Sequence, residues 1–164
     1  MQILSQEDFK TTVKNTNLFA IDLIVRNPEG KILIGLRNNP PAKGFWSVPG
    51  GRVYKNETLN GAFKRIIKSE TGITFDHIES FYLKGLYEHI YEDNIFEDPS
   101  FNTHYIVAAC EIILNENIKP TTDYQHEMLK FDAVADILKD TNVHQYTKNY
   151  FMEAPTNIFF ECKN

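Results

Sequence analysis

The stretch that decides the fold is residues 51–73, which read GRVYKNETLNGAFKRIIKSETGI. Its apolar side chains recur with a helical period and form one stripe, made by Leu59, Ala62, Phe63, Ile66 and Ile67. Asn56 or Thr58 could cap the start of this helix, and Gly72 fits the position just beyond its end. Glu70 falls on the face of Leu59, Phe63 and Ile66, so the helix aims one carboxylate inward.

Strand and helix patterns alternate on both sides of this helix. We expect a helix at 5–15, a β-hairpin from strands 18–26 and 31–36, long strands at 77–88 and 103–114, a short strand at 127–132, and helices at 134–138 and 145–153. Residues 37–44 and 115–125 are expected to be loops. This mixture predicts one α/β or α+β domain over residues 1–164, with a mixed sheet between helices.

Composition narrows the class of protein. The chain has 164 residues, of which 42% are hydrophobic, and a net charge of -5, values that suit a globular protein. The acidic balance argues mildly against nucleic acid as a partner, because phosphate backbones favour basic surfaces. Cys110 and Cys162 indicate neither a disulfide framework nor a zinc site. With no signal peptide and no apolar run of membrane-spanning length, we expect a cytoplasmic protein without a membrane partner.

The stretch at 51–73 resembles the Nudix box, G-x5-E-x7-R-E-U-x-E-E-x-G-U, in which U is aliphatic. Ile66 and Ser69 stand where the pattern has Glu, and the matching residues are Gly51, Glu57, Arg65, Ile67, Glu70, Gly72 and Ile73. The resemblance implies the Nudix fold, an α/β/α sandwich with a mixed β-sheet. It also implies hydrolysis of a nucleoside diphosphate linked to another group, with Mg²⁺ or Mn²⁺ bound at the box.

The two departures change the metal site that the resemblance implies. In the usual box the carboxylates hold one or more metal ions, so losing two of them removes ligands for additional ions. One hard ion, held by few protein ligands and by substrate phosphates, is still chemically reasonable. We interpret Glu70 as a metal ligand, because an unpaired buried carboxylate is unfavourable; the alternative is a surface residue at a fraying helix end. Glu57 and Arg65, about two helical turns apart, are expected to form a structural ion pair.

Residues 4–152 also resemble one Nudix subgroup, the GDP-mannose mannosyl hydrolases. The segments that carry this resemblance are SQEDF, LRNNPPAKGFWSVPGGRV, YEHIYEDN, FNTHYIV, YQHE and NVHQYTKNYF. The subgroup implies that water attacks the anomeric carbon of GDP-mannose or GDP-glucose with inversion, releasing GDP and the free hexose. It also implies one Mg²⁺ per subunit, or Mn²⁺ in its place, and a homodimer.

The positions that match the subgroup suggest a role for each residue. The metal would be held by Glu70, Gln125 and the backbone carbonyl of Gly50. His126 would be the general base, which suits an imidazole near neutral pH. Arg37 and Arg52 would hold the diphosphate through their forked donors. The remaining matches are Asp22 in the catalytic set, His89 and Tyr105 on the sugar or phosphate side, and Gln2, Ile3, Asp8 and Phe9 near the guanosine.

Several of these assignments have simpler alternatives. His126 alone would be a solvated loop histidine, Asp22 could lie on the polar face of a half-exposed strand, and His89 and Tyr105 could be packing residues. Two rival functions stay open: a Nudix pyrophosphatase that attacks phosphorus, and an inactive Nudix domain that binds a nucleotide or a protein. The aromatic-rich loop at 87–101 could be a dimer contact or a wall of the sugar site.

Overall fold

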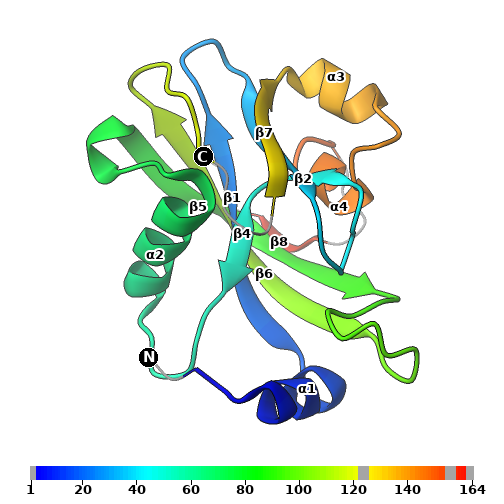
Figure 1. The fold of residues 1–164 in the computed structure, drawn as a ribbon. Helices are drawn as coiled ribbons and strands as arrows, with labels where there is room; N and C mark the ends of the chain where they lie inside the picture. Colours follow the sequence, from blue (N-terminus) through cyan, green and yellow to red (C-terminus); the bar gives the residue numbers. More distant parts are fainter. Residues whose placement is uncertain (1–2, 122–125, 154–157, 162–164) are drawn as a thin grey trace.

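A mixed β-sheet lies between helices on both of its faces (Figure 1). The structure is a computed structural model and describes residues 3–121, 126–153 and 158–161. Its strands are β1 (Leu18–Arg26), β2 (Ile32–Arg37), β3 (Trp46–Ser47), β4 (Gly50–Arg52), β5 (Ile78–Tyr91), β6 (Thr103–Leu114), β7 (His126–Asp132) and β8 (Ile158–Glu161). Its helices are α1 (Gln6–Asn15), α2 (Leu59–Thr71), the 3-10 turn η1 (Phe75–His77), α3 (Val134–Lys139) and α4 (Gln145–Asn149).

Strand order decides which residues meet. Across the sheet the order is β3-β2-β1-β6-β5-β8, with β4 paired to β1 and β7 paired to β2. β1 and β6 run parallel, and the other strand pairs are antiparallel. Asp22, in the middle of β1, therefore lies between Gly50 of β4 and Ala109 of β6. The predicted α/β architecture with a mixed sheet between helices is confirmed.

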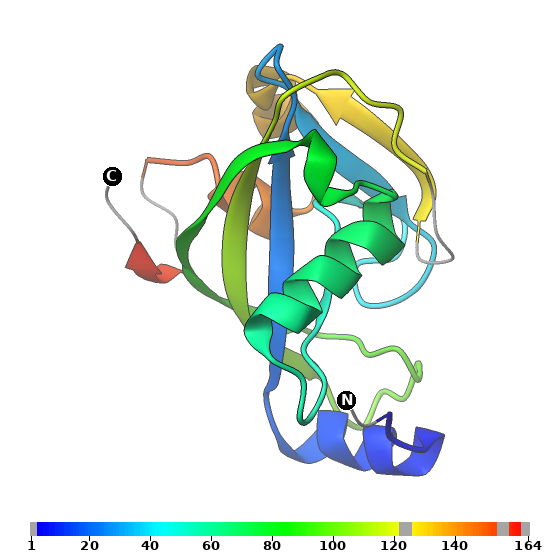
Figure 2. The same cartoon turned by 90° about the vertical axis from the view of Figure 1, so that its left-hand side faces the viewer.

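Alternation along β1 divides its side chains between two cores. The side chains facing α2 join its apolar stripe in one buried cluster, which contains Ile21, Leu23, Val25, Phe63, Ile66 and Ile67. The intervening side chains face α3 and α4 in a second cluster, which contains Ala20, Ile24, Ile137, Val143 and Tyr150. Figure 2 shows α2 lying obliquely across its face of the sheet. Asp22 alternates with the first set, so it belongs to the face covered by α4.

Capping residues set the ends of the two longer helices. The Ser5 hydroxyl accepts from the backbone N–H of Asp8 at 3.1 Å at the start of α1. Thr58, not Asn56, caps α2, and Gly72 ends this helix with a left-handed φ of 70°. Leu59 was expected to face inward but is 59% exposed, because it is the first residue of α2 and precedes the turns that pack on the sheet. None of the described helices is long and apolar enough to cross a membrane.

The elements that differ from expectation are either very short or begin or end at other residues than predicted. β3, β4 and β8 have two, three and four residues, too few for an alternation pattern to be recognised. α4 ends at Asn149 and not at 153, while β5 continues to Tyr91. β7 begins at His126 and not at 127, because its pairing with β2 extends to Arg37 through a local irregularity. The simpler alternative for His126, a solvated loop histidine, therefore does not hold, because His126 is a strand residue and is only 2% exposed.

Glu111 offers a test of what stabilises the sheet. It is 4% exposed, and its Oε1 accepts hydrogen bonds from Arg26 Nε at 2.9 Å and Nη2 at 2.7 Å. Lys84 Nζ donates to Oε2 at 3.3 Å. Burial acts to raise the pKa of this carboxyl, but Arg26 and Lys84 outweigh burial and hold the pKa below its ordinary value of 4.5. We expect Glu111→Gln to lower the free energy of unfolding at pH 7 by about 2 kcal/mol in urea denaturation.

The sign of the pH dependence follows from that lowered pKa. The stabilisation that Glu111 gives the folded state is fully present above the pKa of this carboxyl in the unfolded chain. It is lost as the pH falls through the lower pKa of the folded state. The difference in free energy of unfolding between wild type and Glu111→Gln should therefore narrow once the pH drops below 4.5. Glu29→Gln, at an exposed pair with Lys31, is the matched control and should change the midpoint little. If the two proteins differed in free energy of unfolding by the same amount down to pH 3, this account would be contradicted.

Candidate functional site

A cavity of about 440 Å³ opens between α1, the sheet and α4. It brings together most of the residues predicted from the sequence: Ile3, Phe9, Asp22, Arg37, Gly50, Arg52, Glu70, His89 and Tyr105. Asp8 is exposed instead, and its carboxylate accepts from the Ser5 hydroxyl at 2.7 Å. His126 is not among the lining residues but adjoins Glu70. Gln2 and Gln125 lie outside the described residues.

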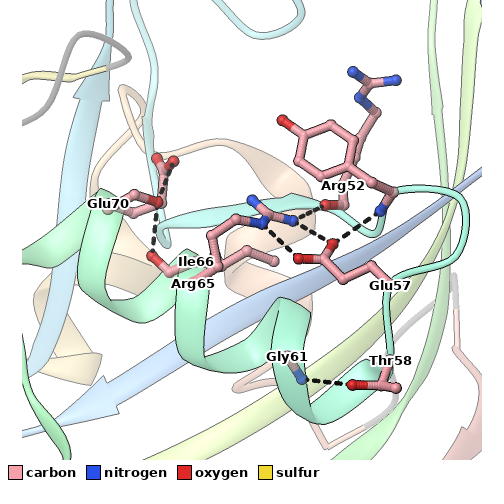
Figure 3. Close-up of polar contacts among 9 residues, drawn as sticks. Arg52, Glu57, Thr58, Gly61, Arg65, Ile66 and Glu70 are labelled. Carbon is pink, nitrogen blue, oxygen red and sulfur yellow. Dashed lines mark hydrogen bonds and ion pairs between the residues drawn. The ribbon is translucent and has the colours of Figure 1, made fainter. Parts of the chain in front are cut away.

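The segment between β4 and α2 is held by Arg65 (Figure 3). The Arg65 guanidinium donates to both carboxylate oxygens of Glu57, at 2.7 and 2.8 Å, and to the backbone carbonyl of Arg52 at 2.7 Å. Glu57 also accepts from the backbone N–H of Tyr54 at 3.0 Å. The hydrogen bond from Arg65 is the main reason that the pKa of Glu57 lies below its ordinary value. The predicted Glu57–Arg65 ion pair is present and fastens β4 to the helix.

Glu70 sits in the last turn of α2 with its carboxylate at the cavity wall (Figure 3). It is 4% exposed, so the inward placement predicted from the helical period is confirmed. Ser69 Oγ lies 3.3 Å from the carbonyl of Ile66 and 3.5 Å from Glu70 Oε1, and its one proton can be donated to either oxygen. His126 Nδ1 lies 3.8 Å from Glu70 Oε2. A buried carboxylate and a buried imidazole thus adjoin at one end of the cavity.

The two departures from the box occupy different environments. Ile66 is fully buried in the core beside α2, and a Cβ built on Gly51 would lie 3.2 Å from its Cγ1. Ile66 therefore packs against β4, and it is not among the residues that line the cavity. Ser69, by contrast, lines the cavity.

The donor atoms at this end of the cavity fit one hard cation. The Glu70 carboxylate and the backbone of Gly50 both line it, and oxygen ligands of these kinds are those that Mg²⁺ prefers. Within the described residues there is no group of three or more His, Cys, Asp or Glu side chains that could hold a metal ion. An ion here would depend on few protein ligands.

Asp22 is enclosed by protein but open to the cavity. The Tyr150 hydroxyl donates to Asp22 Oδ2 at 2.6 Å. Burial raises the pKa of Asp22 to about 6, against the opposing effects of the Tyr150 hydrogen bond and the charge of Arg37. A carboxylate on a half-exposed polar face would not have this environment, so the simpler alternative for Asp22 does not hold.

His89 is 3% exposed at the cavity wall. Its ring stacks on Tyr146, with centroids 4.2 Å apart and an interplanar angle of 2°. Burial, with a smaller effect from the nearby His144, lowers the pKa of His89 to about 3. His89 is therefore neutral at physiological pH and can offer a ligand hydrogen bonds but no charge.

The two predicted diphosphate-binding arginines are held in different ways. Arg37 donates from Nε to the carbonyl of Pro41 at 2.7 Å and from Nη2 to Asn39 Oδ1 at 3.2 Å. The Arg52 guanidinium lies over the Phe9 ring, 3.6 Å from its centroid, a cation–π geometry. Both cations line the same cavity, so it can accept an anionic ligand.

The segment predicted as a loop at 87–101 contributes to the cavity wall through Tyr91, the last residue of β5, and Ile95; its role as a wall of a sugar site stays a prediction. α1 is fastened to this loop: Lys10 pairs with Asp98 at 2.8 Å, and the Phe9 and Phe96 rings lie 5.4 Å apart.

Two features of the site were missed from the sequence. Gly35 of β2 lies directly against His126, since a Cβ on Gly35 would overlap the imidazole ring. His144, which caps α4, and Tyr146 and Thr147 within this helix contribute to the cavity wall, and Tyr150 lies behind it. The signals in the sequence were the resemblance carried by the segment NVHQYTKNYF and the spacing of Tyr146 and Tyr150, which are four apart and so share one helix face.

Gly35→Ala tests whether the glycine makes room for His126. The added methyl should lower the free energy of unfolding by roughly 1–3 kcal/mol through overpacking. In a His126→Ala background the imidazole is gone and only the flexible end of Leu129, 2.8 Å from the added Cβ, remains, so the same substitution should have a smaller effect. Urea denaturation of the four proteins in this cycle measures both steps, and strictly additive effects would contradict the contact.

Comparison with known proteins agrees with this architecture. The family model for the NUDIX domain matches residues 16–152. The low-salt glycan biosynthesis protein Agl8 of Haloferax volcanii is 38% identical over 148 residues, which cover 90% of this chain and 88% of Agl8. A MutT NUDIX hydrolase from Burkholderia pseudomallei superimposes with a TM-score of 0.65 at 22% identity, over 83% of this chain and 96% of that one. The NUDIX domain of Shewanella oneidensis NrtR, complexed with ADP ribose, gives a TM-score of 0.61 at 14% identity, over 90% and 97% of the two chains. The chain belongs to the Nudix family.

Proposed function

We propose that this Nudix protein hydrolyses a GDP-hexose, GDP-mannose or GDP-glucose, at the anomeric carbon, releasing GDP and the free hexose with inversion. The observation that carries the proposal is the environment of the two altered box positions. Ile66 has no carboxylate and is fully buried in the core, so this position supplies neither a metal ligand nor a base. The other altered position, Ser69, carries a hydroxyl in the cavity wall. This end of the cavity suits one cation at a diphosphate better than a multi-metal attack on phosphorus.

The charge of the leaving group is the main electrostatic problem of this reaction. GDP departs with its diphosphate charge, so donors that bind this charge more strongly as it develops lower the barrier. Arg37 and Arg52 line the same cavity and would bind the diphosphate oxygens through their forked N–H groups. The contacts of Arg37 with Pro41 and Asn39 orient its guanidinium before substrate arrives.

Nudix hydrolases generally use divalent ions such as Mg²⁺ or Mn²⁺. Here we propose Glu70, the carbonyl of Gly50 and Gln125 as the ligands. When bound, the ion would supply positive charge at the diphosphate. Glu70 would keep its negative charge in the buried site because that ion neutralises it.

His126 is the proposed general base. It is buried beside Glu70, with its Nδ1 3.8 Å from Glu70 Oε2, and it would take the proton from the attacking water. Asp22 would act beside the reacting carbon as a carboxylate, and His89 and Tyr105 would contact the sugar or the phosphates. Ile3 and Phe9 would lie near the guanosine, with Gln2 as a further proposed contact.

The relative Agl8 supports the substrate class, because it is a protein of glycan biosynthesis and nucleotide sugars are the donors used to build glycans. We further propose that the protein acts as a homodimer. A Nudix pyrophosphatase is the competing function, and its products differ from those proposed.

The bond that breaks can be identified with labelled water. GDP-mannose incubated with the protein and Mg²⁺ in ¹⁸O-water should yield GDP and labelled free mannose, measured by mass spectrometry. Label in a phosphate, together with GMP and mannose 1-phosphate, would overturn the proposal in favour of a pyrophosphatase. No turnover of either GDP-mannose or GDP-glucose would favour an inactive nucleotide-binding domain.

Replacement of the base should slow the chemical step. We expect His126→Gln to lower kcat by roughly 10²–10⁴-fold, the usual range for a general base, with a much smaller change in KM. His104→Gln makes the same substitution at a residue paired with Glu88 outside the cavity wall, and it should leave kcat unchanged. Near-normal turnover by His126→Gln would mean that another group takes the proton.

A further inference from the structure

Behind the cavity wall, three polar side chains from distant parts of the chain are linked through Tyr150. Tyr150 is 2% exposed, and its hydroxyl lies 2.6 Å from Asp22 Oδ2 and 3.3 Å from His89 Nε2. The Tyr87 ring meets the Tyr150 ring edge-on, with centroids 4.7 Å apart. None of the roles assigned above includes Tyr150, although it is the group that joins Asp22 to His89.

The distances determine how the protons are arranged. A separation of 2.6 Å is typical of a hydroxyl that donates to an ionised carboxylate, so Tyr150 donates its single proton to Asp22. The Tyr150 oxygen can then only accept from His89, which places the imidazole proton on Nε2. Because His89 is neutral, Nδ1 carries no proton. A ligand group that reaches Nδ1 must therefore be a donor, such as a sugar hydroxyl.

α4 holds this arrangement in place. Besides stacking on His89, Tyr146 donates its hydroxyl proton to the carbonyl of Ile90 at 2.7 Å and accepts from the backbone N–H of Ile90 at 2.9 Å. Thr147 Oγ1 accepts from the backbone N–H of Val48 at 3.2 Å. These bonds fix α4 to β5 on one side and to the β3–β4 connection on the other. The Tyr150 hydroxyl therefore has little freedom to leave Asp22.

The other oxygen of Asp22 is restricted as well. A Cβ on Gly50 would overlap Asp22 Oδ1, so this oxygen lies directly against the backbone of β4. With Oδ2 bound to Tyr150, the carboxylate is held at both oxygens. Rotation of Asp22 would break the bond to Tyr150 or press the side chain into β4.

We propose that Tyr150 is a positioning residue, which fixes the carboxylate of Asp22 and the Nε2–H tautomer of His89 for the ligand in the cavity. Its effect on turnover rests on the proposed function, whereas its effect on the tautomer does not. Tyr150 itself is not among the residues that line the cavity, so it acts through the two side chains that do.

Kinetics test the part that rests on GDP-hexose hydrolysis. Tyr150→Phe removes one oxygen atom and should lower kcat by roughly tenfold or more, the range for losing a charge-assisted hydrogen bond, while KM changes less than twofold. In an Asp22→Asn background the substitution should have little further effect. Tyr82→Phe is the matched control, because it removes a tyrosine hydrogen bond to another carboxylate, that of Glu111, outside the cavity wall, and it should leave kcat unchanged. Unchanged kcat in a folded Tyr150→Phe protein, or a loss that adds fully to that of Asp22→Asn, would overturn the proposal.

Nitrogen-15 NMR of the imidazole rings tests the tautomer without any substrate. Wild type should show His89 protonated at Nε2, with the signals assigned by their loss in His89→Asn. Asp22→Ala should release the Tyr150 proton toward His89 and shift the ring to the Nδ1–H tautomer, which keeps the test available if Tyr150→Phe does not fold. A wild-type His89 protonated at Nδ1, or one unaffected by Asp22→Ala, would overturn the proposal. If wild type hydrolyses no GDP-hexose, the proposed function fails and the NMR result alone decides the role of Tyr150.

Discussion

The candidate site depends on the guanidinium of Arg65. It joins both carboxylate oxygens of Glu57 to the carbonyl of Arg52 (Figure 3), and so connects the middle of α2 to the end of β4. The chain between these elements has little regular structure of its own, so their separation is set by the Arg65 bonds together with the packing of Ile66 against Gly51. Because α2 is rigid, fixing its middle turn also fixes its last turn, where Glu70 lies. The position of Glu70 relative to the Gly50 backbone thus depends on the hydrogen bonds that Arg65 makes earlier on the same helix.

Ile66 shows how a change in the box can strengthen the fold while removing a functional group. The isoleucine side chain at this position supplies neither a metal ligand nor a base. Isoleucine instead packs beneath Gly51 with no exposed surface. The helix then holds Glu70 by packing as well as by the Arg65 bonds, but the box is left with fewer charges to bind metal. Under the proposed function the base would come from another element, and His126 on β7 is the buried imidazole beside Glu70.

Periodicity in the sequence predicted the parts of the fold whose contacts are local or repeated. Strands 18–26 and 103–114 have the predicted bounds, because long alternating or apolar runs leave a clear pattern. The inward direction of Glu70 followed from the helical period in the same way. Contacts between distant residues left no pattern: Tyr150 and Asp22 are 128 residues apart, and nothing near either one indicates the other. The fit of His126 against Gly35 depends on strand pairing between β2 and β7, which only the folded sheet determines.

The pair of glycines at 50 and 51 explains how side chains from both faces of the sheet can reach one cavity. Successive residues of a strand point to opposite faces, and here each glycine has a close neighbour on its own side. Gly50 lies against Asp22, on the face covered by α4, and Gly51 lies against Ile66 of α2. A larger residue at either position would push β4 away from β1 or from α2. Because both are glycine, β4 lies close to the layers on both faces of the sheet. Glu70 of α2, which covers one face, and Asp22 of β1, whose side chain points to the other face, can therefore line the same cavity.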